Sequence, residues 1–338
     1  MLSLRTCSIG VLLLLWSICR GAEHPAVVKS QFIYQTASFP ECHASTIVQT
    51  PEGLVAAWFG GTREKAPDVC IYAARHDGKA WSAPELVADC VQSDGKRHPC
   101  WNPVLFQGRP GELVLFYKVG PSPSTWWGMR KVSTDHGRTW SAAVRLGKDI
   151  LGPIKNKPVL LGDGTLLCGS STEHDGWRVH MERTRDLGDS AELVPVAADA
   201  SIRVIQPTIL VWGDRLQILC RTDRKKIGSA WSDDGGRSWS KLDLIDLPNP
   251  NAGIDAVSLK DGRALLVFNN TPTGRSPLSL AVSADGKAWK TLLDLETASG
   301  EYSYPAIIQA SDGLVHVTYT WKRQRIRHVV IDAAKLPS

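Results

Sequence analysis

The sequence predicts an all-β protein, a six-bladed β-propeller whose blades are four-stranded antiparallel sheets. Three observations favour this fold. Short runs rich in β-branched and aromatic residues follow one another along the chain, six tight turns separate pairs of these runs, and a second turn signature recurs about every 50 residues. A repeat of that length with several short strands is typical of a propeller blade, which buries its faces only against neighbouring blades.

Each tight turn lies between two runs that we expect to form the inner hairpin of a blade. In the first unit, residues 45–49 and 54–59 flank such a turn, and in the third unit residues 158–161 and 165–168 do so. Gly, Pro and Asp between apolar runs are the usual hairpin signal. The six turns are Pro51-Glu52-Gly53, Pro110-Gly111-Glu112, Gly162-Asp163-Gly164, Gly213-Asp214-Arg215, Asp261-Gly262 and Asp312-Gly313.

The second signature is Ser-x-Asp-x-Gly-x-x-Trp, present at residues 133–140 and 232–239. The Asp can accept hydrogen bonds from backbone N–H groups, the Gly can adopt positive φ, and the Trp can cover the apolar side of the hairpin. We therefore interpret the signature as a folding device and not as a ligand site. Looser copies occur at Asp77/Gly78/Trp81, Asp186/Gly188 and Ser283/Asp285/Gly286/Trp289.

The first 21 residues have the pattern of a secretory signal. Arg5 precedes an apolar stretch over residues 9–16, and small residues lie near Cys19 and Gly21. We expect residues 22–338 to form one propeller domain that is secreted or periplasmic, with a lipid anchor at Cys19 as an alternative. No later segment is apolar enough to predict a membrane span.

Charge and cysteine content give further expectations. Loss of Arg5 and Arg20 lowers the formal net charge from +5 to +3, which does not favour a nucleic-acid partner. Six cysteines then remain, and disulfides Cys90–Cys100 or Cys42–Cys100 are both open, while Cys168 and Cys220 fit buried apolar positions. We expect no cofactor, and no metal because no residue spacing fits a zinc or calcium site. We also expect the protein to be a monomer.

The repeat also predicts which residues meet at the central channel. Residues that enter the first strand or leave the second strand of each blade converge there, although they lie far apart in the sequence. This set is polar and basic, and arginines from separate blades suit a carboxylate or sulfate, since guanidinium makes paired hydrogen bonds to such groups. We therefore expect an acidic sugar as the ligand. Members of this ring include His43, Trp101, Asn102, Gln206, Asp255, Arg63, Asp68, Arg221, Arg275 and Tyr302.

With these motifs the chain resembles the sialidase superfamily, in its BNR or Asp-box repeat branch, over nearly the whole predicted domain. The resemblance implies a six-bladed propeller in which arginines bind the substrate carboxylate, a Tyr assisted by a Glu is the nucleophile, and an Asp is the acid/base. It places Arg221 and Arg275 as carboxylate-binding residues, Tyr302 as the nucleophile and Asp68 as the acid/base.

Two positions differ from the family pattern. His43 stands where the first Arg is expected, and Gln206 stands where the Glu is expected. A neutral amide cannot take the phenol proton, whereas a His is well suited to proton transfer. The sequence therefore leaves three functions open: a sialidase-like exo-acting glycoside hydrolase on glycans with acidic sugars, a His43-dependent hydrolase or lyase on uronate-containing polysaccharide, and a non-catalytic propeller that binds acidic sugars.

The candidate site residues follow from both lines of reasoning. We expect Asp68, Tyr302 and His43 to be catalytic. The expected substrate-binding residues are Arg221, Arg275, Gln206, Asn102, Trp101, Arg63 and Asp255.

Overall fold

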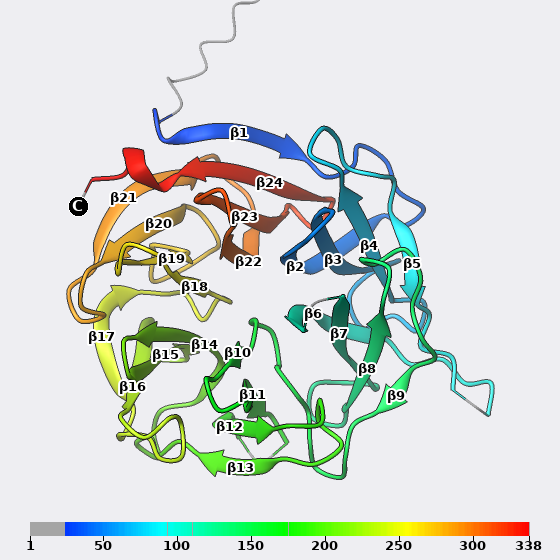
Figure 1. Cartoon of the computed structure of the whole chain (residues 1–338), viewed down its shortest axis with the longest axis horizontal. Coiled ribbons are helices and arrows are strands. Elements are labelled where there is room, and N and C mark those ends of the chain that lie inside the picture. The colour runs from blue at the N-terminus through cyan, green and yellow to red at the C-terminus, as the bar shows by residue number, and fades with distance from the viewer. Residues whose placement is uncertain (1–23, 93, 110, 175, 338) are drawn as a thin grey trace, which may run out of the picture.

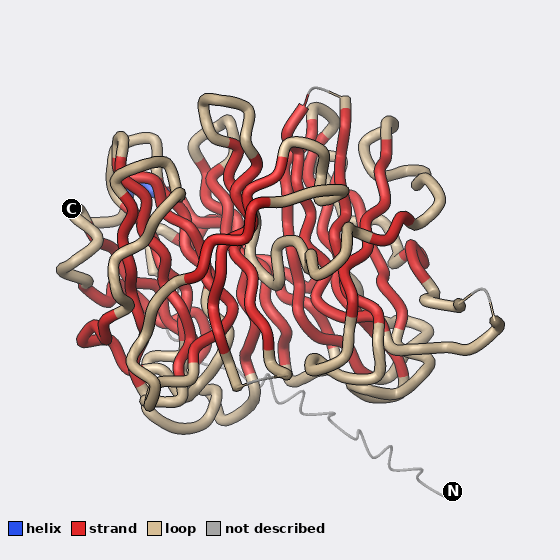
Figure 2. Tube along the Cα trace, turned by 90° about the horizontal axis from the view of Figure 1, so that it is seen from below, coloured by secondary structure: helices blue, strands red, loops and turns tan. Residues whose placement is uncertain are grey.

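Six four-stranded antiparallel sheets form a closed ring, which confirms the predicted propeller (Figure 1). We call the region that the inner strands surround, side chains included, the central channel. The computed structural model describes residues 24–92, 94–109, 111–174 and 176–337. The expected signal segment, residues 1–21, lies outside the described residues. Seen from the side, the strands run between the two ends of the ring, and the loops gather at these ends (Figure 2).

Five blades are built from four consecutive strands. Blade 1 contains β2 (Glu41–Thr50), β3 (Gly53–Gly61), β4 (Cys70–His76) and β5 (Glu85–Ala88), and blade 2 contains β6 (Cys100–Arg109), β7 (Glu112–Val119), β8 (Trp127–Ser133) and β9 (Val144–Arg145). Blade 3 contains β10 (Val159–Leu160), β11 (Leu166–Thr172), β12 (Arg178–Thr184) and β13 (Glu192–Pro195). Blade 4 contains β14 (Val204–Trp212), β15 (Arg215–Thr222), β16 (Lys226–Ser232) and β17 (Asp243–Pro248), and blade 5 contains β18 (Asp255–Ser258), β19 (Ala264–Phe268), β20 (Leu278–Ser283) and β21 (Lys290–Glu296).

Blade 6 joins the two ends of the described chain. It contains β22 (Tyr302–Gln309), β23 (Leu314–Trp321) and β24 (Arg325–Asp332), and its outermost strand is the N-terminal β1 (Val27–Phe32). Antiparallel pairing of β1 with β24, from Val27 opposite Ile331 to Phe32 opposite Arg327, closes the ring. This closure has no counterpart in the repeat and was not predicted.

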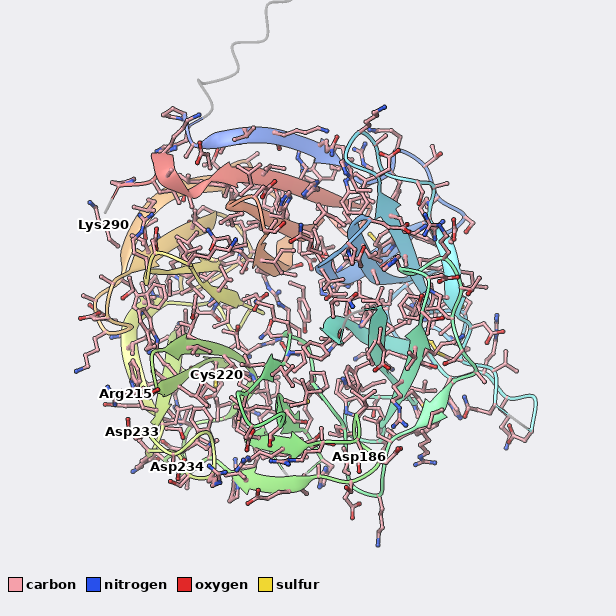
Figure 3. All side chains as sticks on the ribbon, in the orientation of Figure 1. Asp186, Arg215, Cys220, Asp233, Asp234 and Lys290 are labelled. Carbon is pink, nitrogen blue, oxygen red and sulfur yellow. A yellow bond between two sulfur atoms is a disulfide. The ribbon has the colours of Figure 1, made fainter. Side chains whose placement is uncertain are left out.

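The recurrent Ser-x-Asp turns connect the third strand of a blade to its fourth. Ser133 Oγ accepts a hydrogen bond from the Gly137 backbone N–H at 2.8 Å, and Asp135 accepts from the Thr139 N–H at 2.8 Å. Hydrogen bonds that Asp135 accepts from the Thr139 hydroxyl, the Thr139 N–H and the Ser133 hydroxyl hold the pKa of Asp135 below its usual range. The equivalent Asp186 and Asp234 lie at the outer rim (Figure 3), far from the channel, so the structural interpretation of the signature is confirmed.

Clusters of hydrophobic side chains fill the space between blades, and the tryptophans of the Ser-x-Asp-x-Gly-x-x-Trp signature pack against them. Trp140 contacts the cluster of blades 1 and 2, and Trp239 contacts the cluster of blades 3 and 4. Cys90 and Cys100 form a disulfide, one of the two expected pairings, while Cys168 and Cys220 are buried and free as predicted. No helix within the described ranges is long and apolar enough to cross a membrane.

Candidate functional site

Irregular inner strands direct side chains into the channel. Strands β2, β6, β14 and β22 each shift register in the middle, and each carries one non-glycine residue with positive φ at that point. A bulge of this kind re-aims a side chain away from the regular alternation of the strand. The four residues are Ala44, Asn102, Gln206 and Tyr304, with φ of 56°, 38°, 57° and 51°.

Tyr304 lies at the centre of the candidate site. Its hydroxyl accepts a hydrogen bond from Arg221 Nη1 at 3.0 Å and from Gln206 Nε2 at 3.3 Å. Its ring packs against the His43 ring, with centroids 4.3 Å apart, and lies close to Gly253, where a Cβ would approach the ring to 3.3 Å. Lys155 Nζ lies 5.8 Å from the ring centroid. Four blades thus contribute to the surroundings of this phenol.

Three arginines from blades 4, 5 and 6 surround this tyrosine and His43. Arg221, at the end of β15, is held by Asn251, which accepts from its Nε at 2.9 Å. Arg323 follows β23 and donates to Glu301 at 3.0 Å and to Glu64 at 2.7 Å. Arg275 lies between β19 and β20, and within the described residues its buried Nη1 has no hydrogen-bond partner. A buried cationic donor without a protein partner is available to hydrogen-bond an anion.

His43 is a neutral imidazole in this environment. Burial, together with the charges of Arg323, Arg275, Arg221 and Lys155, holds its pKa well below the usual range. Its Nδ1 is buried and has no hydrogen-bond partner among the described residues. A neutral ring nitrogen of this kind can accept a proton or a ligand hydrogen bond.

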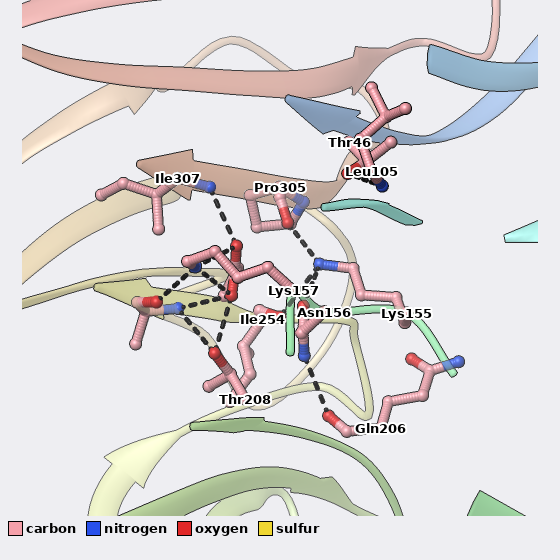
Figure 4. A network of polar contacts seen from close by, with 12 residues as sticks. Thr46, Leu105, Lys155, Asn156, Lys157, Gln206, Thr208, Ile254, Pro305 and Ile307 are labelled. Carbon is pink, nitrogen blue, oxygen red and sulfur yellow. Dashed lines mark hydrogen bonds and ion pairs between the residues drawn. The ribbon is translucent and has the colours of Figure 1, made fainter. Parts of the chain in front are cut away.

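A polar network around Lys155 adjoins Tyr304, since Lys155 Nζ lies 5.8 Å from the Tyr304 ring centroid, and we call it the floor of the site. Its contacts are drawn in Figure 4. Lys155 Nζ donates to Asn156 Oδ1 at 2.8 Å, to the Ile254 carbonyl at 3.0 Å and to the Pro305 carbonyl. Burial lowers the pKa of Lys155 to about 7. The inner strand of blade 3 is reduced to Val159–Leu160, which leaves residues 155–157 free to cross under the channel.

Asp255 belongs to this floor and not to a ligand site. Its carboxylate accepts from Lys157 Nζ at 3.0 Å, from Thr208 Oγ1 at 2.7 Å and from the Ile307 N–H at 2.9 Å. It therefore braces blades 3, 4, 5 and 6 against each other. The expectation that Asp255 binds substrate is corrected, because these partners occupy both of its oxygens.

Tyr302 does not lie with the arginines. Its side chain is 1% exposed and belongs to the hydrophobic cluster between blades 5 and 6, with Leu280 and Tyr319 among its members. Alternation along β22 would place Tyr302 and Tyr304 on one face, but the bulge after Ser303 separates them. Tyr304 thus replaces Tyr302 as the tyrosine of the candidate site.

Trp101 and Asn102 are also enclosed. The Trp101 indole N–H donates to the Gly120 carbonyl at 2.8 Å, and the ring packs edge-on against Trp126 and Phe59. Trp101 is therefore a core residue, and the expectation of substrate contact is corrected. Asn102 occupies the bulge of β6 and is 5% exposed.

Asp68 and Arg63 lie on the loop between β3 and β4, at the same end of the channel. Arg63 is exposed, whereas Asp68 is half-buried and accepts from the Thr62 N–H and hydroxyl at 2.8 and 2.5 Å. Partial burial opposes the effect, but these hydrogen bonds hold the pKa of Asp68 below its usual range. A carboxyl that stays ionised is poorly suited to donate a proton.

Glu173, which follows β11, has the opposite character. Burial raises the pKa of its carboxyl, against the opposing charges of Arg221 and Lys65 and a hydrogen bond to Trp177. Trp177 in turn lies against Arg221, with the guanidinium carbon 5.4 Å from the ring centroid. Glu173 is thus a candidate proton donor beside the arginines. The sequence interpretation gave it no role, although it lies at a strand end that the repeat assigns to the channel.

The site therefore combines a place for an anion with groups that can move protons. His43, Gln206, Arg221 and Arg275 come together as expected, and Tyr304, Arg323, Glu173 and Lys155 complete the set. Among the described residues, no group of three or more His, Cys, Asp or Glu side chains is arranged to hold a metal ion.

Comparisons with known proteins agree with this architecture. The model of the BNR repeat-like domain matches residues 52–317. No curated protein matches the chain. A Dyadobacter fermentans protein of unknown function superposes with a TM-score of 0.76 at 18% identity, and the match covers 91% of this chain and 100% of that one.

Two sialidase structures are also similar. The NanB sialidase of Streptococcus pneumoniae has a TM-score of 0.75 at 12% identity, over 91% of this chain and 71% of that one. The intramolecular trans-sialidase of Ruminococcus gnavus has a TM-score of 0.75 at 13% identity, over 94% of this chain and 100% of that one. At these identities the similarity establishes the shared fold.

Proposed function

This chain belongs to the BNR repeat-like domain family, and we propose that it is an exo-acting glycoside hydrolase that removes acidic sugars from glycans. One observation carries the proposal. Arg221, Arg275 and Arg323 come from three blades: Arg221 donates to the Tyr304 hydroxyl, Arg275 lies within electrostatic reach of Tyr304 and of the other two arginines, and among the described residues the buried Arg275 Nη1 has no partner. Three guanidinium groups close together favour a carboxylate ligand, since each of them can donate two parallel hydrogen bonds to its oxygens.

The same geometry supports a mechanism. With the sugar carboxylate held by the arginines, the Tyr304 hydroxyl gives its proton to the neighbouring His43 imidazole and its oxygen bonds to the anomeric carbon, while the glycosidic bond breaks and Glu173 gives its proton to the departing oxygen. The Glu173 carboxylate then takes a proton from water, whose oxygen bonds to the anomeric carbon as the bond to Tyr304 breaks, and His43 returns the proton to the Tyr304 oxygen. Arg221, 3.0 Å from the Tyr304 hydroxyl, stabilises negative charge that develops there.

Gln206 favours a second candidate function. Its amide, and no carboxylate among the described residues, contacts the Tyr304 hydroxyl. In a uronate lyase, His43 Nδ1 or the Tyr304 oxygen would remove the C5 proton, the C4–O bond would break, and Glu173 would protonate the leaving oxygen. The arginines would stabilise the enolate that the carboxylate becomes when the C5 proton leaves, before the C4–O bond breaks.

Substrates that differ only in the charge of the acidic sugar test the proposal. Purified protein is incubated with sialosides, with uronate-terminated oligosaccharides, and with the methyl esters of both, and released sugar and ultraviolet absorbance are measured together. We expect release from the free acids and little from the esters, because the ester gives the arginines no anion. Equal turnover of acid and ester would contradict the role of the arginines.

The same assay separates the alternatives. A product with a new ultraviolet absorbance contains an unsaturated ring and would identify the lyase. Saturable binding with no product at all would leave an acidic-sugar-binding propeller. We also propose that the protein acts outside the cytoplasm, and the Cys90–Cys100 disulfide supports this, because such bonds persist in oxidising compartments.

A further inference from the structure

A second hollow opens between blades 2 and 3, beside the arginine site. It has a volume of about 800 Å³ and is lined from both blades, with Trp126, Trp127 and Arg145 on one side and His174, His180 and Leu193 on the other. A volume of this size accommodates more than one sugar ring. The residues of the proposed hydrolytic site do not line it.

The hollow and the arginine site share a wall and open at the same end of the propeller. Thr172 and His174 line the hollow, whereas Glu173 between them lies near Arg221. Alternate residues of an extended segment face opposite sides, which accounts for this division. Ser124, also in the lining, donates to the Glu173 carbonyl at 3.5 Å. A glycan could therefore pass from one site to the other across the Glu173 backbone.

The inner end of the hollow contains a fixed histidine. His180 Nε2 lies 3.1 Å from Glu182 Oε1, and Glu182 is buried. The Leu151 and Gly152 backbone N–H groups donate to the two oxygens of Glu182 at 2.9 and 2.6 Å. A buried carboxylate held in this way fixes the orientation of the imidazole, as in sites built to contact a ligand.

The outer part offers an aromatic ring and cationic groups. The Arg145 guanidinium lies over Trp127, 5.0 Å from the ring centroid, and Lys148 and Asp149 belong to the same lining. Sugar rings pack on aromatic side chains through their apolar faces, and the two cations Arg145 and Lys148 outnumber the single carboxylate of Asp149 in the lining. The chemistry favours a sugar that carries negative charge.

We propose that this cleft between blades 2 and 3 binds the acidic sugar next along the glycan, so that the protein acts on chains in which acidic sugars are adjacent. The proposal rests on the proposed function, because the terminal sugar must occupy the arginine site. It predicts that affinity rises with chain length, and that residues of the cleft carry the increase.

Calorimetric titration of the Tyr304→Phe protein, which should not cleave the oligomers during the measurement, tests this with two monomer–oligomer pairs: N-acetylneuraminic acid with its α-linked dimer, and galacturonic acid with its trimer. Trp127→Ala, His174→Ala and Trp231→Ala are made in the same background. We expect one oligomer to bind at least about tenfold more tightly than its monomer, a difference of about 1.4 kcal/mol. Trp127→Ala should remove that gain and leave monomer affinity unchanged. His174→Ala, at an exposed position, tests the same cleft if Trp127→Ala does not fold.

Trp231→Ala is the matched control. Trp231 also lies under an arginine, with Arg215 4.6 Å from its ring centroid, but it lies on blade 4, outside the cleft. It should leave both affinities unchanged. Monomer binding without gain from the second sugar would overturn the cleft proposal alone. If neither monomer nor oligomer bound, the arginine site and the cleft proposal would both fail.

Discussion

The outer rim and the central channel use the same repeat in opposite ways. At the rim, Ser133 and Ser232 occupy equivalent positions and make the same hydrogen bond, to Gly137 and Gly236 at 2.8 and 2.9 Å. At the channel, the equivalent bulge positions carry Ala44, Asn102, Gln206 and Tyr304. The backbone is repeated in both regions, but the side chains are repeated only at the rim.

This difference separates residues that fold the blades from residues that can bind a ligand. A turn needs the same hydrogen bonds in every blade, so its residues recur. A channel enclosed by different blades presents one asymmetric site, so each blade contributes a different group. Substitutions at the rim should therefore affect stability, and substitutions at the channel should affect activity.

The largest effect is expected for Tyr304→Phe. Loss of the hydroxyl removes the proposed nucleophile and the partner of Arg221, so we expect turnover to fall by roughly a thousandfold or more. The free energy of unfolding should fall by no more than about 1–2 kcal/mol, because Arg221 Nη1 keeps its hydrogen bond to Gln206 Oε1 and the ring keeps its contact with His43. Initial rates on the best acidic substrate, measured with a melting curve of the same sample, check both statements.

Tyr302→Phe is the natural control for this change. Tyr302 lies two residues earlier on the same strand, within the core. It should retain nearly full turnover. If Tyr302→Phe were inactive and Tyr304→Phe active, the bulge in β22 would not determine which tyrosine serves the site.

Glu173→Gln should have the second largest effect. Its raised pKa keeps Glu173 protonated to higher pH than an ordinary carboxyl, so activity should fall as pH rises above that pKa. The amide should lower turnover by about a hundredfold or more and remove this alkaline decline. A pH–rate profile of both proteins measures it. Asp68→Asn is the comparison, and a larger loss there would return the role of acid to Asp68.

The fold could be predicted from the sequence because its determinants are local. Each tight turn and each Ser-x-Asp turn depends on residues within about ten positions, and the six copies support one another. The closing strand β1 could not be predicted in this way. It pairs with β24 across almost the whole chain, and no repeat contains it.

The site could be predicted only in part. Arg221 and Arg275 follow from their place in the repeat, and Tyr304 had a signal of its own. Tyr304-Pro305 matches Gln206-Pro207 and Asn102-Pro103, at two of the other three bulges, whereas Tyr302 is followed by Ser303. Arg323 and Glu173 depend on contacts between loops of different blades, such as Arg323 with Glu64, which spacing does not reveal.

A third prediction concerns the contact between blade 1 and blade 6, where the ring closes and Trp81 meets His328 of β24. His328 is buried beside His316, with Nε2 to Nδ1 at 3.0 Å, and Trp81 donates to its Nδ1 at 3.2 Å. Burial, with His316, His76 and Lys29, lowers the pKa of His328 from 6.5 to about 3. The unfolded chain binds more protons in this interval, so stability should fall as pH drops from about 6.5 towards 3.

Urea unfolding at several pH values measures this dependence. His76 and His316 also have lowered pKa values through burial, with Asp77 and Asp312 opposing, so they act in the same direction. His328→Gln keeps a polar side chain but cannot titrate in this range, and should flatten the decline. An unchanged slope would show that other groups control acid unfolding, and that the closure is not the acid-sensitive part of the ring.

The smallest effect is expected at the rim. Ser133→Ala leaves the Gly137 N–H without its partner, and we expect a loss of about 1–2 kcal/mol in the free energy of unfolding with turnover unchanged. Ser232→Ala removes the same contact from blade 4 and should lower the free energy of unfolding by about the same amount.

Alanine at Asn102, Gln206 and Tyr304, the equivalent channel positions, should instead change turnover by unequal amounts. Urea titrations and initial rates on all five variants test this, and unequal losses at the two serines would mean that the rim is not a uniform repeat.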